Sequence, residues 1–231
     1  MTDEDFKEGQ VLLIDKPLNW TSFQVVNKVR WLIRENYKIK KIKVGHAGTL
    51  DPLASGLLII CTGKFTKRIT EFMGQEKEYT GTFTLGATTP SYDLETEIDE
   101  TFPTEHITRE LIFQTSHDFI GSLDQFPPVF SALKKDGKRL YEYAREGEAV
   151  EIPSRRVEIR EFEITRIDLP EVDFRVSCSK GTYIRSLAHD FGAALQSGAH
   201  LSALRRTRIG NYKVEDAITV EEFESKHSIK V

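Results

Sequence analysis

Apolar and polar residues alternate along this chain in a way that predicts short strands and helices. Gln10–Ile14 is an apolar run that indicates an opening strand, and Leu57–Cys61 is a continuous apolar run typical of a buried strand. Between them, Thr21 or Ser22 can cap a helix to about Arg34, because apolar residues recur there at helical spacing. The first third of the chain therefore predicts strand, helix and strand.

The rest of the chain continues this mixture. Glu78–Gly86 and Glu171–Ser179 alternate between apolar and polar residues, which predicts strands with one buried face, and Val157–Leu169 also has the pattern of a strand. Because no regular strand–helix–strand repeat is visible, we expect an α+β fold with a mixed, mainly antiparallel sheet flanked by helices. The further expected helices are 66–72, 104–114 and 181–195.

One segment interrupts the pattern of regular elements. Gly121–Gly147 is rich in Pro, Lys, Arg and Gly, and we expect an insertion over about 121–152 that projects from the core. A chain of 231 residues, 39% of them hydrophobic, can bury a sizeable core. We therefore expect a single domain over residues 1–231 that carries this insertion.

The charge of the chain is distributed unevenly. A net charge of −4 argues against unspecific binding to polyanions. Basic residues nevertheless gather at Lys38–Lys43, Lys134–Arg139, Arg155–Arg160 and Leu204–Arg208. Any one such cluster is usually a solvated face, but four on an acidic protein favour a folded basic groove.

Several classes of protein are disfavoured. The longest apolar stretch is far too short to span a bilayer and the N-terminus is acidic, so we expect a cytoplasmic protein without a membrane partner. Cys61 and Cys178 lie in apolar or alternating segments and are expected to be core residues. Since neither zinc-ligand spacing nor a glycine-rich nucleotide loop is present, we expect no metal and no cofactor.

The segment Gly45–Leu57 concentrates turn-forming residues around one carboxylate, Asp51. Gly48 allows a close backbone approach, and Pro52 fixes its own φ while it restricts Asp51 to extended conformations. Asp51 would therefore be held rigidly before a buried strand. An isolated Asp-Pro pair is most often an ordinary turn, so this loop alone supports a turn as well as an active site.

Three segments together identify a family. Gly45–Gly56, Ser131–Arg145 and Gly181–Ala188 resemble the TruB family of tRNA pseudouridine-55 synthases. Lys16-Pro17 near the start supports the resemblance, which covers about residues 9–216 in the family's order. It implies the pseudouridine-synthase fold, with a thumb-like insertion that closes on RNA.

The resemblance also implies roles for single residues. Asp51 matches the catalytic aspartate that attacks the target uridine, and Arg185 matches the arginine that keeps this carboxylate ionised and oriented. Tyr79 matches the aromatic residue that stacks on the flipped base and assists proton transfer. The resemblance places Tyr183 and Leu204 in the uracil pocket. His46 matches the residue that inserts into the tRNA loop.

The implied substrate is the T-stem-loop of tRNA. Its uridine must be flipped out of a stack at a cost of about a few kcal/mol, which phosphate contacts have to offset. We expect a monomer that works without guide RNA and without the separate C-terminal PUA domain of longer family members, because the chain ends 23 residues after Arg208. The expected RNA contacts are Lys134, Lys138, Arg139, Arg205 and Arg206.

Three alternative functions stay open at this point. A non-catalytic RNA-binding module would keep the fold, but it would have no need of the set Asp51, Tyr79 and Arg185. A hydrolase that used Asp51 with His46 would lack a nucleophile elbow and metal-ligand spacing. A guide-dependent relative acting on ribosomal RNA is disfavoured by the short C-terminal region. The attacked atom, base or sugar, and the group that accepts the C5 proton also stay open.

Overall fold

The computed structural model describes residues 2–131, 133–135, 137–146 and 151–227. The chain packs into two compact units, of which unit 1 comprises Met1–Tyr79 and Leu204–Val231, and unit 2 comprises Thr80–Ala203. The single catalytic domain expected over residues 1–231 stays a prediction, because compact packing does not decide whether the units fold separately.

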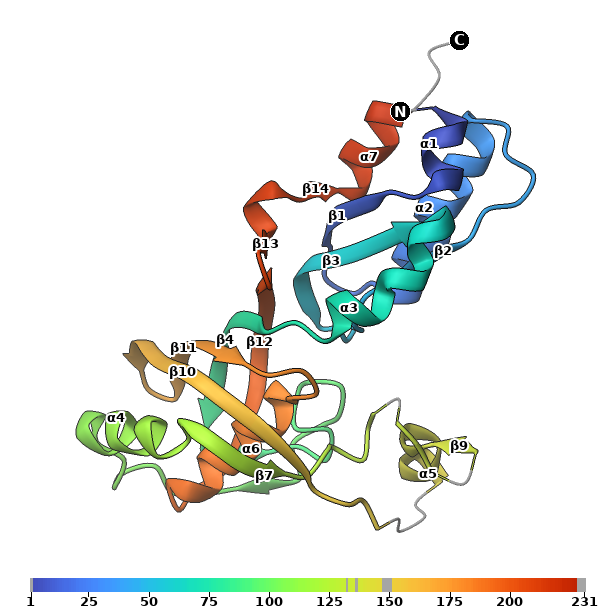
Figure 1. Cartoon of the computed structure of the whole chain (residues 1–231). Helices are drawn as coiled ribbons and strands as arrows, with labels where there is room; N and C mark the ends of the chain where they lie inside the picture. The colour runs from blue at the N-terminus through green and yellow to red at the C-terminus, as the bar shows by residue number, and fades with distance from the viewer. Residues whose placement is uncertain (1, 132, 136, 147–150, 228–231) are drawn as a thin grey trace. The chain divides into compact units, whose positions relative to one another are not determined.

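Unit 1 is built on a small mixed sheet (Figure 1). β1 pairs antiparallel with β3, while β14 pairs parallel with β1 and the C-terminal half of β12 pairs parallel with β3. The short β2 adds to β3, and β13 forms a hairpin with β12. The strands are β1 (Val11–Lys16), β2 (Val44–His46), β3 (Ala54–Thr62), β12 (Ala199–Ile209), β13 (Tyr212–Lys213) and β14 (Ile218–Thr219).

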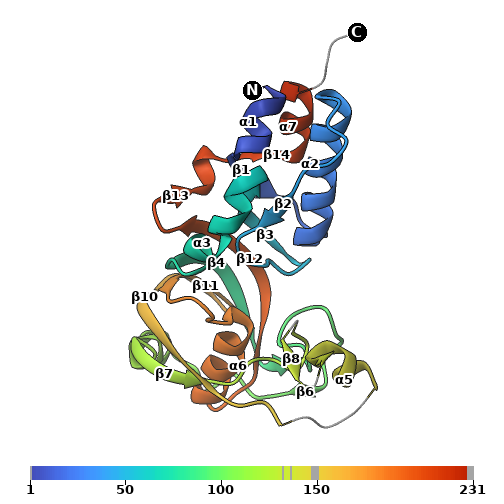
Figure 2. The ribbon, with the colours of Figure 1, turned by 45° about the vertical axis from the view of Figure 1, so that its right-hand side comes forward.

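Helices cover both faces of β3, which explains its continuous apolar sequence. Leu58 and Ile60 pack against α2 and α7, whereas Leu57 and Ile59 face α3. Lys28 of α2 also pairs with Glu224 of α7 at 2.9 Å, in agreement with the neighbouring positions of α1, α2 and α7 in Figures 1 and 2. The helices are α1 (Asp3–Glu8), α2 (Ser22–Asn36), α3 (Ile69–Met73) and α7 (Val220–His227), with 3-10 turns η1 (Gly63–Arg68) and η2 (Val214–Asp216).

The N-terminus of α2 confirms the predicted cap. The Thr21 side chain accepts a hydrogen bond from the Gln24 amide, and the Gln24 side chain accepts one from the Thr21 amide. Such a capping box satisfies two amides that the first turn leaves without helical partners. The helix expected over 66–72 is instead a 3-10 turn followed by the five residues of α3.

Unit 2 contains an antiparallel sheet with helices α4 and α6. β11 pairs with β10, and β10 pairs with β7. The core is aromatic, since Phe83 stacks on Phe174 with ring centroids 4.2 Å apart, and Phe162 and Phe191 close the cluster. The strand β4 (Lys77–Leu85) belongs to unit 2 from Thr80 onward. The other elements are β5 (Ala87–Thr88), β6 (Glu100–Thr101), α4 (Arg109–Asp118), β7 (Gly121–Gln125), β10 (Arg155–Asp168), β11 (Glu171–Cys178) and α6 (Ile184–Ala194).

Two predicted boundaries in unit 2 differ from the structure. α4 begins at Arg109, because Thr108 and not Thr104 caps its first turn. β7 lies inside the range expected for the insertion, but it is a strand of the main sheet, so the inserted part follows Gln125. That part contains β8 (Lys134–Lys135), β9 (Lys138–Arg139) and α5 (Leu140–Glu146), of which β8 and β9 form a hairpin.

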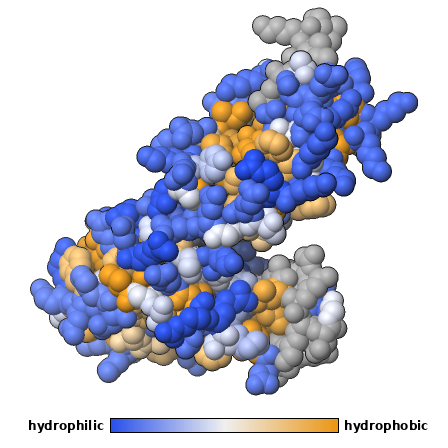
Figure 3. Space-filling model, in the orientation of Figure 1, coloured by the Kyte–Doolittle hydropathy of each residue, from blue (hydrophilic) through white to orange (hydrophobic). Residues whose placement is uncertain are grey.

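Both cysteines lie in the core, as their sequence context predicts. Cys61 and Cys178 are both buried, and burial raises the pKa of Cys61 to about 11. Hydrophilic residues cover most of the face seen in Figure 3. Within the described ranges, the helices are too short or too polar to cross a membrane.

Candidate active site

Asp51 lies in the loop between β2 and β3, and hydrogen bonds hold this loop from two sides. The Ser22 hydroxyl, in the first turn of α2, donates to the Leu50 carbonyl at 3.1 Å and accepts from the Leu50 amide at 2.9 Å. The Asn19 amide donates to the Pro52 carbonyl at 2.8 Å. The residues immediately before and after Asp51 are therefore both held by the segment that contains Asn19 and the first turn of α2.

Two glycines make the path of this loop possible. Gly48 and Gly56 have φ values of +95° and +105°, a region that side chains disfavour. A Cβ atom on Gly56 would lie 2.3 Å from the carbonyl oxygen of Arg206, closer than real contacts allow. The turn residues recognised in the sequence thus serve both backbone conformation and close packing against β12.

Arg206 of β12 fixes the same loop from inside. Its side chain is 1% exposed, Nε donates to the Leu57 carbonyl at 2.8 Å, and Nη2 donates to the Gly48 carbonyl at 3.1 Å. These carbonyls flank Asp51 in the sequence. A single buried guanidinium therefore connects the two ends of the Asp51 loop.

A second buried cation lies near the carboxylate. Lys16, at the end of β1, is fully buried, and its Nζ donates to the carbonyls of Pro17 at 2.9 Å and Trp20 at 2.6 Å. Burial lowers the pKa of Lys16 to about 8, while the charge of Asp51 raises it and that of Arg206 lowers it. Asp51 and the buried Lys16 thus lie within electrostatic range of each other, and a nearby cation is physically useful to a carboxylate that acts as a nucleophile.

His46 and Leu204 are placed beside this loop by strand pairing. His46 ends β2 opposite Ile60 of β3, and Leu204 of β12 lies opposite Ala54, three residues after Asp51. Burial lowers the pKa of His46 and the charge of Arg206 also lowers it, against the opposing effect of a backbone hydrogen bond with Gly48. The imidazole is therefore neutral at pH 7, a state suited to stacking among bases.

Tyr79 belongs to the same unit. It lies in the part of β4 that is assigned to unit 1, with 8% of its surface exposed. Its neighbour Glu78 accepts a hydrogen bond of 2.8 Å from the Thr207 hydroxyl of β12. Unit 1 therefore supplies Asp51, Tyr79, His46 and Leu204.

Arg185 lies in the first turn of α6 in unit 2 and is held by the loop before β6. Nη1 donates to the Ser91 carbonyl at 3.2 Å, and Nε lies 3.6 Å from a carboxylate oxygen of Asp93. Both charged side chains are almost completely buried, which makes this ion pair sensitive to the loss of either partner. The pairing of Arg185 with Asp51, a residue of unit 1, stays a prediction.

Tyr183 is positioned by a glutamine at the end of β7. The fully buried Gln125 donates through Nε2 to the Tyr183 carbonyl at 3.1 Å and accepts from the Tyr183 amide at 2.8 Å. The guanidinium of Arg155 lies 5.4 Å from the centroid of the Tyr183 ring. The start of α6, with Arg185, is thereby tied to the sheet of unit 2.

The predicted RNA contacts differ in what surrounds them. In the arginine segment, Arg205–Arg208, Arg205 forms two hydrogen bonds of 2.7 and 3.0 Å to Asp15, and Arg208 pairs with Glu76 at 2.9 Å. Arg206 is buried, a position that disfavours contact with an RNA phosphate. Its predicted RNA contact stays a prediction. Lys138 pairs with Glu146 and lies over the Tyr143 ring. The side chains of Lys134 and Arg139 lie outside the described residues.

Sequence reasoning missed three residues of this constellation. Gln125 and Asp93 lie in segments with no distinctive pattern, so only folding could reveal their partners. Lys16 entered the sequence analysis only as support for the family resemblance, but a lysine at an inward-facing position of an apolar strand was a usable signal. A charge in such a place must find partners, which here are carbonyls and a carboxylate.

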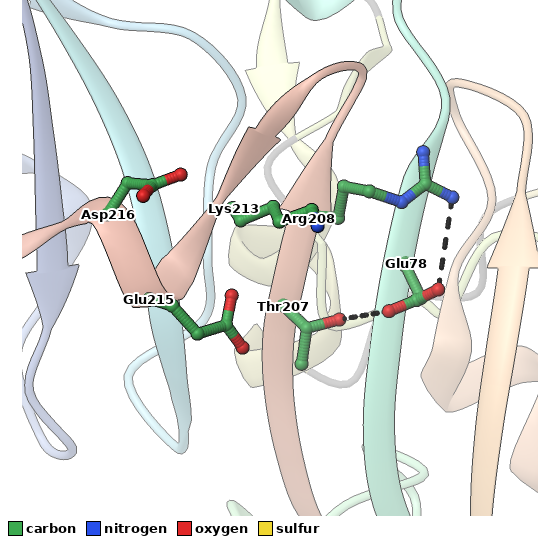
Figure 4. A pocket seen from close by; sticks show the side chains of 6 residues that line it. All are labelled: Glu78, Thr207, Arg208, Lys213, Glu215 and Asp216. Carbon is green, nitrogen blue, oxygen red and sulfur yellow. Dashed lines mark hydrogen bonds and ion pairs between the residues drawn. The ribbon is translucent and has the colours of Figure 1, made fainter.

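A separate pocket of about 570 Å³ also lies in unit 1 (Figure 4). Arg208 and Lys213 lie on the paired strands β12 and β13, and the Arg208 guanidinium points toward Glu78, while Glu215 and Asp216 line the pocket from η2. Three acidic side chains would face any phosphate that entered, so its charge does not suit an RNA backbone. Its lining residues are Glu78, Thr207, Arg208, Lys213, Glu215 and Asp216. Within the described part of the chain, no group of three His, Cys, Asp or Glu residues could hold a metal ion.

Comparisons with known proteins place this geometry in a family. Residues 34–184 match the model described as TruB family pseudouridylate synthase, N-terminal domain. Residues 185–230 match the model described as tRNA pseudouridylate synthase B C-terminal domain.

Individual proteins are also similar over most of the chain. The tRNA pseudouridine synthase B of Flavobacterium johnsoniae is 68% identical over 97% of this chain and 98% of its own length. That of Phocaeicola vulgatus is 61% identical over 95% of this chain and 93% of its own length. The crystal structure of a Cbf5-Nop10-Gar1 complex contains a 31% identical chain with a TM-score of 0.72, covering 96% of this chain and 55% of that one. The chain therefore belongs to the TruB family of pseudouridylate synthases, which are isomerases.

Proposed function

We propose that this protein converts uridine 55 in the T-loop of tRNA to pseudouridine in the cytoplasm. The observation that carries the proposal is the Asp51 loop, which Arg206 and Ser22 fix and in which the charge of Asp51 acts on the buried ammonium group of Lys16. The relatives with 68% and 61% identity are named tRNA pseudouridine synthase B, which supports tRNA as the substrate.

In the proposed reaction, Asp51 attacks the flipped nucleotide as an ionised nucleophile. The N1–C1′ bond breaks, the uracil turns within the pocket, and a C5–C1′ bond forms. The proton leaves C5 and one proton is taken up at N1, so the product is an isomer of the substrate. Asp51 is released unchanged, and the balance needs neither an oxidant nor a second substrate.

The other site residues orient this reaction. Tyr79 stacks on the base and assists proton transfer, while Tyr183 and Leu204 line the uracil pocket. Arg185, oriented by Asp93, pairs with the Asp51 carboxylate in the closed site. His46 fills the space that the flipped base leaves in the loop. We propose that the protein acts as a monomer and without guide RNA.

The decisive experiment compares wild type with Asp51→Asn on an unmodified tRNA transcript that contains uridine 55. Wild type converts that position without added RNA, and the variant is slower by roughly 10³-fold or more, because the nucleophile is lost. Pseudouridine is mapped by chemical probing under single-turnover conditions. Asp3→Asn, the same change at a surface ion pair of unit 1, serves as the matched control.

Two outcomes would overturn the proposal. If Asp51→Asn modifies tRNA as fast as wild type, Asp51 is not the nucleophile. If wild type modifies RNA only when a guide RNA is added, the guide-dependent alternative holds. Melting temperatures of the three proteins show whether a loss of activity reflects unfolding.

A further inference from the structure

The loop that follows α2 carries the densest group of exposed lysines in unit 1. In the sequence Lys38-Ile-Lys-Lys-Ile-Lys43 all four lysines are exposed, while Ile39 and Ile42 are buried. We call residues 38–43 the lysine loop. It leaves the end of α2 at the edge of unit 1 in Figure 1, and the corresponding edge is mostly hydrophilic in Figure 3.

The two isoleucines determine which way the lysines point. Ile39 and Ile42 belong to the same core cluster as the inner face of α2. Burying each is worth roughly 1.5–3 kcal/mol, and burying a lysine instead would be unfavourable. The alternation therefore anchors the lysine loop at two points and directs four ammonium groups to solvent.

The ends of the lysine loop are fixed as well. The Ile39 amide donates to the Arg34 carbonyl at 3.1 Å, and the Gly63 amide donates to the Lys43 carbonyl at 2.9 Å. Arg30 adds a hydrogen bond of 3.0 Å to the Val44 carbonyl just beyond it. A surface held in this way loses little backbone entropy when it binds a partner.

The charges of the lysine loop are not neutralised inside the described part of the protein. Among the described residues, none of its four ammonium groups forms an ion pair, whereas Lys7, Lys28 and Lys64 pair with Asp3, Glu224 and Glu8. The stretch from residue 36 to residue 50 also contains no Asp or Glu. An acidic protein with a net charge of −4 thus keeps one segment strongly positive.

The lysine loop leads directly into the strand that carries His46. Lys43 precedes β2, and His46 is three residues further along the chain, so their Cα atoms are about 10 Å apart at about 3.3 Å per strand residue. This distance corresponds to about three nucleotides of a stacked strand at about 3.4 Å each. A nucleic acid that receives His46 therefore has its backbone within reach of the lysine side chains.

We propose that the lysine loop is a second RNA-binding surface, which contacts the phosphate backbone of the T-stem-loop next to the position that His46 enters. The inference rests on the proposed function for its RNA partner. The lysine loop would be a fixed patch of unit 1, in addition to the predicted contacts of the thumb. It would recognise the charge of phosphates and not the base sequence.

The test measures binding as a function of salt. Lys40→Gln/Lys41→Gln is compared with wild type on an isolated T-stem-loop RNA that contains uridine 55. Each phosphate contact contributes about 0.7–0.9 to the slope of log K against log salt, so the double variant should lower the slope by about 1.4–1.8. In single-turnover assays the double variant should need a higher enzyme concentration to reach half of the maximal rate. Its maximal rate should not change, because the lysine loop takes no part in holding Asp51.

The control removes the same charge elsewhere in unit 1. Lys7→Gln/Lys64→Gln deletes two lysines that are already paired, and its salt slope should equal that of wild type. An unchanged slope for the lysine-loop variant, or an equal change in the control, would overturn the inference. An effect on whole tRNA that is missing with the stem-loop would overturn the placement beside His46.

Two variants distinguish a failure of the proposed function from a failure of the inference about the lysine loop. Asp51→Asn should lose pseudouridine formation and keep the wild-type salt slope. If Asp51→Asn stays active while the lysine-loop variant lowers the slope, the catalytic assignment fails and the lysine loop still binds RNA. If Asp51→Asn is inactive and the lysine-loop variant keeps the slope, the catalytic assignment stands and the lysine loop does not contact RNA.

Discussion

The lysine loop and the arginine segment carry similar positive charge, but their surroundings differ. Arg205 and Arg208 pair with Asp15 and Glu76, and Arg206 is buried against backbone carbonyls. The lysines at 38, 40, 41 and 43 are exposed, and no acidic residue occurs between positions 36 and 50. Two basic clusters that look equivalent in the sequence therefore serve different purposes, since one holds unit 1 together and the other faces solvent.

The difference follows from the kind of element in which each cluster lies. The arginine segment lies in β12, where strand pairing with β3 brings backbone carbonyls and acidic side chains within reach. The lysine loop leaves a helix end, and only its isoleucines enter the core. Basic residues in a sheet interior become structural donors, whereas basic residues on a surface loop keep their charge for a partner.

The largest effect should come from Arg206. In Arg206→Ala the carbonyls of Gly48 and Leu57 lose a charged donor, at about 1–3 kcal/mol for each buried acceptor left unpaired. The free energy of unfolding should therefore fall by roughly 2–6 kcal/mol in urea denaturation. Arg206→Lys keeps one donor and should lose less. A loss below about 1 kcal/mol for the alanine variant would show that Arg206 does not hold the loop.

A smaller, pH-dependent effect should come from Lys16. Its pKa of about 8 in the folded protein lies below its ordinary value of 10.5, because burial disfavours the charged amine. Between pH 8 and pH 10.5 the unfolded chain binds the proton that the folded protein has lost, so the stability contributed by Lys16 rises with pH. Below pH 8 both states are protonated and the cost of the buried charge is fully present.

Lys16→Met tests this sign. The free energy of unfolding of wild type minus that of Lys16→Met should increase from pH 8 to pH 10.5. Lys28→Met, at a partly exposed ion pair in α2, is the control and should show no such rise. A difference that stays constant or decreases over this range would contradict the assignment of Lys16 as a buried, partly neutralised cation.

The smallest effect should come from the outer arginines. Arg205→Gln/Arg208→Gln removes two partly exposed ion pairs, each worth about 0–1 kcal/mol of stability. Because both guanidinium groups are already paired, the salt slope of binding to the T-stem-loop RNA should match that of wild type. A slope lowered by about 1.4–1.8 would instead place the arginine segment on RNA and remove its contrast with the lysine loop.

Local pattern predicted much of the fold. The strands at β1, β3, β4, β10 and β11 and the capped helix α2 follow from alternation, apolar runs and cap residues, which act over a few neighbouring positions. Boundaries failed where competing local signals existed, as at Thr104 and Thr108 before α4. The membership of β7 in the sheet could not be predicted, because its pairing with β10 joins residues 30 to 38 positions apart, from Gln125 with Arg155 to Gly121 with Ile159.

The sequence by itself determined the family, the α+β class and the candidate residues Asp51, Tyr79 and Arg185, because spacing and residue type are local properties. Tertiary structure alone decided that Arg206 is buried behind the Asp51 loop, that Gln125 holds Tyr183, and that the four lysines of the lysine loop face solvent. Whether a charge is buried, paired or exposed depends on which distant segments pack around it. That arrangement is set by the energy of the whole fold and not by neighbouring residues.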